Sequence, residues 1–185
     1  MKYKVMIVED QTMPRELFEL RVQASERFEL ALSIDNAALA DVYCLRFPVD
    51  LILMDVITRD GENGLDAAAR IKRAFPQIKI IIVTSMPECS YLKRAKEIGV
   101  ESFWYKEEQR ESLLDVMERT MNGESVYPGA SPELTLGMAS SYQFTERELD
   151  ILREITSGDT NQEIADRLNM SVATVKTHIL NMLEK

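Results

Sequence analysis

The sequence predicts an α/β protein in which a five-stranded, doubly wound parallel sheet is followed by a small all-α domain. Two observations predict this class. Across residues 1–120, short apolar runs typical of buried strands alternate with stretches typical of helices, as in a parallel sheet with helices on both faces. After a segment rich in glycine, proline and serine, residues 142–185 carry the start signals of helices only.

Five strand and helix pairs can be counted in the first region, and local features support them. Three of the strand candidates are continuous apolar runs bounded by polar residues, which suits strands covered on both faces. Pro14 suits the first turn of a helix, and Gly99 suits the end of one. The expected strands are 4–8, 28–34, 51–54, 78–83 and 102–105, and the expected helices are about 14–23, 36–47, 64–75, 88–98 and 108–122.

A predicted linker separates the second region from the first. Residues 121–141 contain three glycines, two prolines and four serines, a composition typical of a connecting segment. Beyond it, two capping-box pairs and one N-cap serine mark helix starts, and two short helices joined by a three-residue turn predict a helix-turn-helix. The expected domains are 1–120 and 142–185, and the helix starts are Thr145 with Glu148, Thr160 with Glu163, and Ser171.

Composition and charge exclude several classes of protein. The chain has 185 residues, 45% of them hydrophobic and 29% charged, which is typical of globular proteins rather than disordered, collagenous or disulfide-rich ones. Its longest apolar runs, at 51–54 and 80–83, are far shorter than the roughly 20 residues of a membrane helix. A net charge of −9 without a basic tail excludes a non-specific binder of nucleic acid. We therefore expect a soluble, cytoplasmic protein without a membrane partner.

Chemically active side chains follow the expected strands at the points where the strands end. Glu9 and Asp10 follow the first strand, Asp55 the third, Thr84 the fourth and Lys106 the fifth. Ligands of open α/β sheets bind at this edge, where these groups would meet. Taken singly, each is more often a helix cap or a solvated charge, but their coincidence favours a site. Carboxylates bind hard dications such as Mg2+, and a carboxylate can attack phosphorus while a metal and a lysine offset the charge.

These residues, in this order and spacing, make residues 1–120 resemble the receiver domains of two-component response regulators. The resemblance implies a flavodoxin-like fold in which Asp55 is the phosphoacceptor and attacks the phosphohistidine of a sensor histidine kinase. Thr84 and Lys106 would hold the phosphoryl oxygens. Phe103 matches the aromatic residue that the family couples to this threonine, so it would rotate in behind Thr84 after phosphorylation. The implied ligands of Mg2+ are Glu9, Asp10, Asp55 and the backbone carbonyl of Ile57.

The loop after the phosphoacceptor departs from the family pattern. The family usually has Met-Pro at the third and fourth positions after the aspartate and glycine at the eighth. Here those positions hold Thr58, Arg59 and Asn63, and Gly64 comes one residue later. We therefore expect a loop of altered shape.

Ile57 leads to two further expectations. Ile57 and Met86 flank the expected water path, and neither apolar side chain can orient a hydrolytic water, so we expect a long-lived phosphoryl group. An aspartyl-phosphate hydrolase usually needs a second aspartate two residues after the nucleophile. Because Ile57 stands at that position, the sequence disfavours this class of enzyme.

Residues 142–185 resemble the LuxR-type helix-turn-helix of NarL/FixJ response regulators through Thr145, Arg147, Glu148, Leu152, Gly158 and the runs 161–168 and 174–178. The last helix would enter the major groove of DNA. The resemblance points to Lys176 and Thr177 for DNA contact, and helix geometry adds Thr174, Asn181 and Leu180, the last suited to touch a thymine methyl. The opposite arc, which should face the core, holds Val172, Val175, Ile179, Met182 and Leu183.

Two features weaken the expected DNA binding. Residues 142–185 hold 5 basic and 8 acidic residues, so attraction to DNA phosphates should be weak. Family members also carry a fourth helix that helps to form the dimer, whereas this sequence ends at Lys185. We expect a truncated chain that binds DNA weakly or not at all.

The combined expectation is a response regulator rather than an enzyme. Phosphorylation at Asp55 would control binding to promoter DNA and transcription, with a homodimer forming after phosphorylation. The alternative is a phosphorylation-switched protein-interaction module whose truncated output domain does not bind DNA. Retarded mobility of a specific promoter fragment would separate the two.

Overall fold

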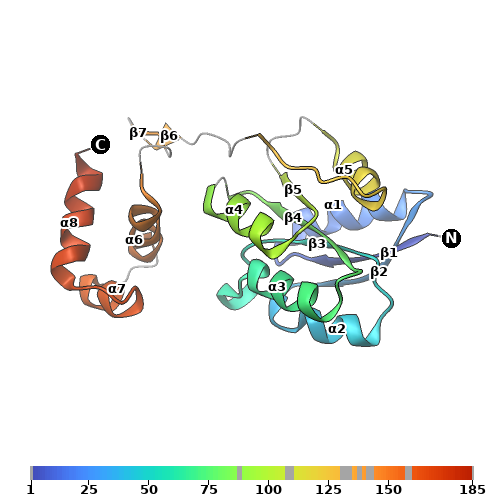
Figure 1. Ribbon diagram of the computed structural model, residues 1–185, viewed down its shortest axis with the longest axis horizontal. Helices are drawn as coiled ribbons and strands as arrows, with labels where there is room; N and C mark the ends of the chain where they lie inside the picture. Colours follow the sequence, from blue (N-terminus) through green and yellow to red (C-terminus); the bar gives the residue numbers. More distant parts are fainter. Residues whose placement is uncertain are drawn as a thin grey trace. The chain divides into compact units, whose positions relative to one another are not determined.

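The computed structural model describes residues 2–86, 89–106, 111–129, 135–136, 139–140, 144–156 and 160–184. Contacts divide the chain into two compact units, Met1–Pro132 and Glu133–Lys185, which Figure 1 shows as a sheet-containing part and a helical part. The division falls inside the predicted linker, and the exact domain boundaries stay predictions. Each unit has a hydrophobic core of its own.

The first unit is built on five parallel strands in the order β2-β1-β3-β4-β5. The chain passes from β1 to β2 on one side and then to β3 on the other, so the strand order reverses between β1 and β3. Val8 pairs with Met54, and Met54 with Ile82, which keeps the carboxyl ends of the central strands level. The strands are β1 (Tyr3–Val8), β2 (Phe28–Ile34), β3 (Leu51–Met54), β4 (Lys79–Thr84) and β5 (Ser102–Tyr105).

Helices cover both faces of this sheet (Figure 1), so the predicted doubly wound class is confirmed. Alternate side chains of a strand point to opposite faces, and here they build two separate cores. One core joins Val5 and Ile7 to α1 and α5, and the other joins Met6 and Val8 to α2, α3 and α4. The helices are α1 (Thr12–Gln23), α2 (Ala40–Arg46), α3 (Gly64–Ala74), α4 (Cys89–Ile98) and α5 (Leu113–Met121).

Two helices of the first unit differ from their predicted limits by more than two residues. The expected helix 36–47 is divided into the 3-10 turn η1 (Ala37–Leu39) and α2. The expected helix 108–122 begins only at Leu113, because Ser112 accepts an N–H of the first turn and acts as its N-cap. Some of its predicted first residues lie outside the described part of the chain.

The described residues of the second unit form three helices and a pair of short antiparallel strands, which was not predicted. None of the helices described in either unit combines the length and the apolarity needed to cross a bilayer. The elements are β6 (Thr135–Leu136), β7 (Ala139–Ser140), α6 (Glu146–Thr156), α7 (Asn161–Arg167) and α8 (Val172–Leu183).

The three predicted helix starts in the second unit are confirmed by their hydrogen bonds. The Thr160 N–H donates to Glu163 Oε2 at 2.8 Å, and Thr160 Oγ1 accepts the N–H of Glu163. Thr145 and Glu148 repeat this reciprocal pattern, with the Thr145 N–H 2.7 Å from Glu148 Oε2. Ser171 caps α8 by accepting an N–H of its first turn. These bonds satisfy donors that a helix leaves unpaired at its start.

The core of the second unit is small and apolar. Val175 of α8 is fully buried, and the neighbouring positions of the predicted inward arc, Val172, Ile179 and Met182, pack partly against the core. The prediction that Leu183 faces this core is wrong, because 78% of the residue is exposed. Leu183 lines an open apolar hollow of about 390 Å³ at the surface of this unit and is not packed in its core. The fully or nearly fully buried hydrophobic residues described in this unit are Ile151, Ile164, Ala165 and Val175.

Candidate functional site

Loops at the carboxyl edge of the sheet bring charged side chains together as the strand order predicts. Glu9 and Asp10 follow β1, Asp55 follows β3 and Lys106 follows β5. Lys106 Nζ donates a hydrogen bond to Asp55 Oδ2 at 2.7 Å and lies 2.5 Å from Glu9 Oε2. One ammonium therefore contacts two carboxylates from different strands.

The three carboxylates lie close enough together to share one cation. One oxygen from each of Glu9, Asp10 and Asp55 lies within 4.8 Å of the others. Glu9 is fully buried and Asp55 almost so, whereas Asp10 is partly exposed. Glu9 Oε2 contacts the Lys106 ammonium but accepts no well-aligned hydrogen bond from the described residues. A buried oxygen in this state is suited to bind a hard cation.

The pocket has more negative than positive charge. Among its described residues, three carboxylates accompany the single ammonium of Lys106. Burial, and then the charge of Asp55, raises the pKa of Glu9 to about 7, although Lys106 and the N–H of Gln11 act in the opposite direction. A bound divalent cation would favour the charged form of all three carboxylates.

Contacts to both the backbone and the side chain hold Asp55 in place. Its N–H donates to Val8 O at 2.9 Å, and the N–H of Val56 donates to Asp55 Oδ1 at 2.7 Å. Gly64 packs against its carbonyl, because a Cβ atom at Gly64 would lie 1.8 Å from Asp55 O. Only glycine allows such a close approach. The displaced glycine is visible in the sequence, but this contact is not, because it depends on the path of the whole loop.

The loop from Asp55 to α3 is closed by a buried threonine. The loop contains the 3-10 turn η2 (Arg59–Gly61). The Thr58 hydroxyl donates to Glu62 O at 3.0 Å and accepts the N–H of Ala37 at 3.0 Å. This role could not be predicted from the sequence, because a threonine in a loop gives no signal of burial. The altered shape of this loop relative to the family stays a prediction.

Thr84 and Phe103 lie on the two neighbouring strands β4 and β5. Thr84 is buried, and its Oγ1 accepts the N–H of Met86 at 3.1 Å, which leaves the hydroxyl proton for another acceptor. The N–H of Lys106 donates to Thr84 O at 2.9 Å and joins the ends of the two strands. Phe103 is buried, with its ring 5.0 Å from that of Tyr105. Because Thr84 pairs with Tyr105, Phe103 lies two positions away from Thr84 along the sheet.

Two apolar residues come two positions after Asp55 and Thr84. Ile57 and Met86 are 42% and 38% exposed. Ile57 forms an isolated antiparallel bridge with Asn63, whose side chain caps α3. The bridge fixes the main chain at the residue whose carbonyl is the predicted fourth metal ligand.

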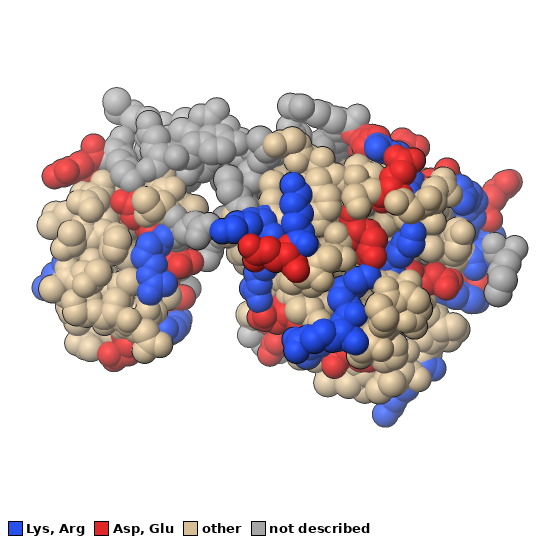
Figure 2. Space-filling model, in the orientation of Figure 1, with Lys and Arg blue, Asp and Glu red and all other residues tan. Residues whose placement is uncertain are grey.

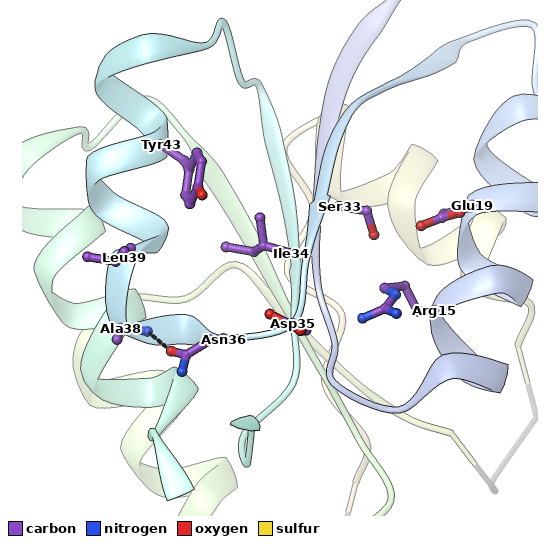
Figure 3. Close-up of a pocket in the computed structure, with 9 residues that line it drawn as sticks. All are labelled: Arg15, Glu19, Ser33, Ile34, Asp35, Asn36, Ala38, Leu39 and Tyr43. Atoms are coloured by element: carbon purple, nitrogen blue, oxygen red, sulfur yellow. Dashed lines mark hydrogen bonds between the residues drawn. The ribbon is translucent and has the colours of Figure 1, made fainter. Parts of the chain in front are cut away.

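An open hollow of about 590 Å³ lies along β2 and is distinct from the carboxylate pocket (Figure 3). Arg15 and Glu19 of α1 line it on one side of the strand, and Leu39 and Tyr43 on the other. The Arg15 guanidinium also donates to Glu9 O at 3.1 Å, so α1 is tied to the loop that carries two of the carboxylates. None of the predicted site residues lines this hollow.

The residues predicted to contact DNA form an exposed face of α8, opposite the buried Val175. The hydroxyl of one of them, Thr177, donates to Ala173 O in its own helix at 3.0 Å. Figure 2 shows acidic and basic side chains intermixed on the visible face of the molecule rather than a basic stripe. The exposed set is Thr174, Lys176, Thr177, Leu180 and Asn181.

A doubly wound domain with an acidic pocket, followed by a helix-turn-helix unit, is the architecture of a regulator that joins a signalling domain to a DNA-binding domain. Known families match both parts of the chain. The response regulator receiver domain matches residues 5–118, and the luxR family of bacterial regulatory proteins matches residues 142–185. The chain therefore belongs to the response regulators and has a receiver domain and a luxR-type DNA-binding domain.

Relatives and solved structures agree with this assignment. The response regulator protein VraR of Staphylococcus epidermidis is 34% identical over all of this chain and 90% of its own length, and VraR of Staphylococcus aureus gives the same values. A structure of the RcsB response regulator of Salmonella typhimurium has a TM-score of 0.63 at 17% identity, covering 96% of this chain and 88% of that chain. A structure of two RcsB dimers bound to two parallel DNAs has a TM-score of 0.64 at 16% identity, with the same coverage. At these identities, the structures show a shared fold.

Proposed function

We propose that this response regulator accepts a phosphoryl group on Asp55 from the phosphohistidine of a sensor histidine kinase. The modified form then controls binding to promoter DNA and transcription. The observation that carries the proposal is the 2.7 Å contact between Asp55 Oδ2 and Lys106 Nζ, in a pocket that holds two further carboxylates. The ammonium provides positive charge at the place where the phosphoryl group would add negative charge.

Mg2+ is the cation that we propose for this pocket. Glu9, Asp10 and Asp55 supply carboxylate oxygens within 4.8 Å of one another, and the backbone carbonyl of Ile57 is the proposed fourth ligand. A set of few, hard oxygen ligands suits Mg2+, which keeps part of its water shell. Glu9 Oε2 is buried and accepts no well-aligned hydrogen bond from the described residues, which supports this fit. When bound, the ion offsets the charge of the carboxylates and of the transferring phosphoryl group.

Each side chain of the pocket has its own role in the transfer of the phosphoryl group to Asp55. A carboxylate oxygen of Asp55 forms a bond to phosphorus while the P–N bond of the phosphohistidine breaks and the imidazole leaves. Lys106 moves its hydrogen bond from Asp55 to a phosphoryl oxygen, where the negative charge is greater. Thr84 donates its hydroxyl proton to another phosphoryl oxygen, since its oxygen already accepts the Met86 N–H.

Phe103 is the proposed switch residue. Thr84 pairs with Tyr105, and the Phe103 ring lies 5.0 Å from the Tyr105 ring on the same face of the sheet. When Thr84 turns toward the phosphoryl group, it leaves space on this face, and Phe103 moves in behind it. The surface of α4, β5 and α5 changes as a result, and we expect a homodimer to form after phosphorylation.

The output is the exposed face of α8, with promoter DNA as its partner. The described RcsB assembly of dimers on DNA supports both DNA and a second copy of the chain as partners. DNA contact is proposed for Thr174, Lys176, Thr177, Leu180 and Asn181. The site of action is proposed to be the cytoplasm.

Incubation with Mg2+ and acetyl phosphate tests the phosphoacceptor. Wild type and Asp55→Asn are compared by intact mass and by sedimentation velocity. We expect one added phosphoryl group and a shift toward dimer for wild type, and neither for Asp55→Asn. A wild-type chain that stays unmodified would reject Asp55 as the phosphoacceptor.

A gel-mobility assay with promoter fragments tests the output. Retardation of a specific fragment by the phosphorylated chain would support control of transcription. If the phosphorylated chain retards no fragment, the protein-interaction alternative is favoured. The exposed apolar residues Leu180 and Leu183, which are 60% and 78% exposed, are the observation that supports that alternative.

A further inference from the structure

The segment that follows α5 is bound to the sheet. Residues 124–127 form a strap that makes two hydrogen bonds to β5, both through the main chain of Val126. The N–H of Phe103 donates to Val126 O at 2.8 Å, and the N–H of Val126 donates to Ser102 Oγ at 3.1 Å. Because β5 is the last strand in the sheet order, the strap occupies an edge that would otherwise be unpaired.

Tyr127 anchors the end of the strap. Its hydroxyl donates to Val100 O at 2.7 Å, and its ring centroid lies 6.4 Å from that of Phe103. The Lys96 ammonium lies 5.0 Å from the Tyr127 ring centroid, within the range of a cation–π contact. Burial, and then the charge of Glu101, raises the pKa of Tyr127, so its hydroxyl keeps the proton that it donates. These partners belong to α4, to the turn after it and to β5.

The strap contacts the proposed switch residue on the side away from the phosphoryl pocket. Tyr127 is bound at Val100, before β5 begins, whereas Thr84 is paired with Tyr105 at the carboxyl end of β5. A movement of Phe103 toward Thr84 is therefore a movement away from the Tyr127 ring. Phe103 also bears both partners of the strap, since its ring lies beside that of Tyr127 and its N–H donates to Val126 O.

We propose that the strap is a latch that phosphorylation releases: docked on β5, it holds Phe103 back from Thr84, and displacement of Phe103 detaches it. The latch rests on the proposed function, because phosphorylation at Asp55 is what moves Thr84. Release adds residues 124–127 to the tether of the DNA-binding domain, which extends its reach by up to about 14 Å. Linkage requires the reverse effect as well, so that a detached strap favours the phosphorylated pocket.

The amide of Phe103 reports on the latch directly, because its acceptor is Val126 O. Residue-resolved hydrogen exchange is measured on the full chain with and without Mg2+ and beryllofluoride, a phosphoryl mimic whose binding is followed by fluorine NMR. We expect exchange at Phe103 to become at least tenfold faster with the mimic. The control is the amide of Lys79, which donates to Asp50 O in another part of the sheet and should not change.

The two failures can be told apart. Unchanged protection of Phe103 in a chain that has bound the mimic overturns the latch and leaves the phosphoacceptor intact. A chain that binds no mimic and takes no phosphoryl group from acetyl phosphate overturns the proposed function, and phosphorylation-driven release with it.

Variants at Tyr127 test the anchor in the unmodified chain. Tyr127→Ala removes the ring and the hydroxyl, so exchange at Phe103 should become at least tenfold faster without any mimic. Tyr127→Phe keeps the ring but loses the bond to Val100, so a smaller increase is expected. The matched control, Tyr43→Phe, removes the hydroxyl of another half-buried tyrosine and should have no effect.

Mimic affinity completes the test. Beryllofluoride should bind Tyr127→Ala more tightly than wild type, because the strap no longer has to be detached. Thermal melting checks that each variant is folded. Equal Phe103 protection and equal mimic affinity in folded wild type and Tyr127→Ala overturn the latch.

Discussion

The phosphoryl pocket and the DNA-binding face of α8 differ in how firmly the fold fixes them. Glu9, Asp55 and Thr84 are buried, and Lys106 already contacts two carboxylates. On α8, by contrast, the predicted contact residues are exposed, and the Thr177 hydroxyl bonds to its own helix. A buried set of groups has its geometry before a ligand arrives, whereas an exposed face takes its working geometry from the partner. Chemistry can therefore be inferred from structure in the pocket, while on α8 only the available side chains can be named.

The largest expected effect is at Gly64, where the pocket has no space. A Cβ atom would lie 1.8 Å from Asp55 O, so Gly64→Ala must displace the backbone of the phosphoacceptor. We expect the free energy of unfolding to fall by about 3 kcal/mol and phosphorylation by acetyl phosphate to be lost. Urea unfolding and intact mass measure the two effects.

Gly61→Ala is the matched control for this prediction. A Cβ at Gly61 meets nothing within 4 Å, but the residue has a φ of 74°, so only backbone strain is added. That strain should cost about 1 kcal/mol, and phosphorylation should continue. Equal stability of the two variants would mean that the contact between Gly64 and Asp55 relaxes easily.

The lifetime of the phosphoryl group is the next largest expected effect. Ile57 and Met86 offer no polar atom to orient a hydrolytic water, so the group should persist for minutes or longer in magnesium buffer. Ile57→Asn supplies such an atom and should shorten the lifetime by at least about tenfold, whereas Met86→Leu should leave it unchanged. A time course of intact mass measures the decay. Loss of the group from wild type within seconds would contradict the prediction.

The features that could be predicted from the sequence are those that depend on local sequence pattern or on the order of the strands. The contact between Asp55 and Lys106 follows from the strand order, which brings the carboxyl ends of strands to one edge. The strap and the contact of Gly64 were missed because they depend on packing between distant segments. Tyr127 lies in a segment whose composition is typical of a linker. Composition describes the segment as a whole and does not show which of its residues binds to the sheet. Leu183 was placed inward by helical period alone, which does not show where the neighbouring helices end.

A smaller effect is expected on α8, where the individual contacts are exposed. Lys176→Ala should weaken binding to promoter DNA to a similar extent for all sequences and reduce the slope of log affinity against log salt by about 1. Lys93→Ala, an exposed lysine of α4, is the control and should leave the slope unchanged. Fluorescence anisotropy at several salt concentrations measures both. An unaltered slope for Lys176→Ala would show that this lysine does not contact the DNA.

The most local expected effects distinguish the two capping boxes of the second unit, in which Thr160 pairs with an exposed glutamate and Thr145 with a buried one. Hydrogen bonds from Thr160, first from its N–H and then from its hydroxyl, lower the pKa of Glu163. A carboxylate whose folded pKa is lowered stabilises the fold above its ordinary pKa of 4.5 and loses that contribution as the pH falls through the lower value. Protection of the α7 amides in the full chain should therefore fall as the pH is lowered below about 4.5, and Glu163→Gln should remove this part of the pH dependence.

Thr160→Ala should lower the free energy of unfolding by about 1 kcal/mol and Thr145→Ala by about 2 kcal/mol. The loss is larger at Thr145 because its partner, Glu148, is buried and would lose a donor that water replaces poorly. Equal losses of protection in α6 and α7 would show that water reaches Glu148 as readily as Glu163, and that burial adds nothing to the first cap.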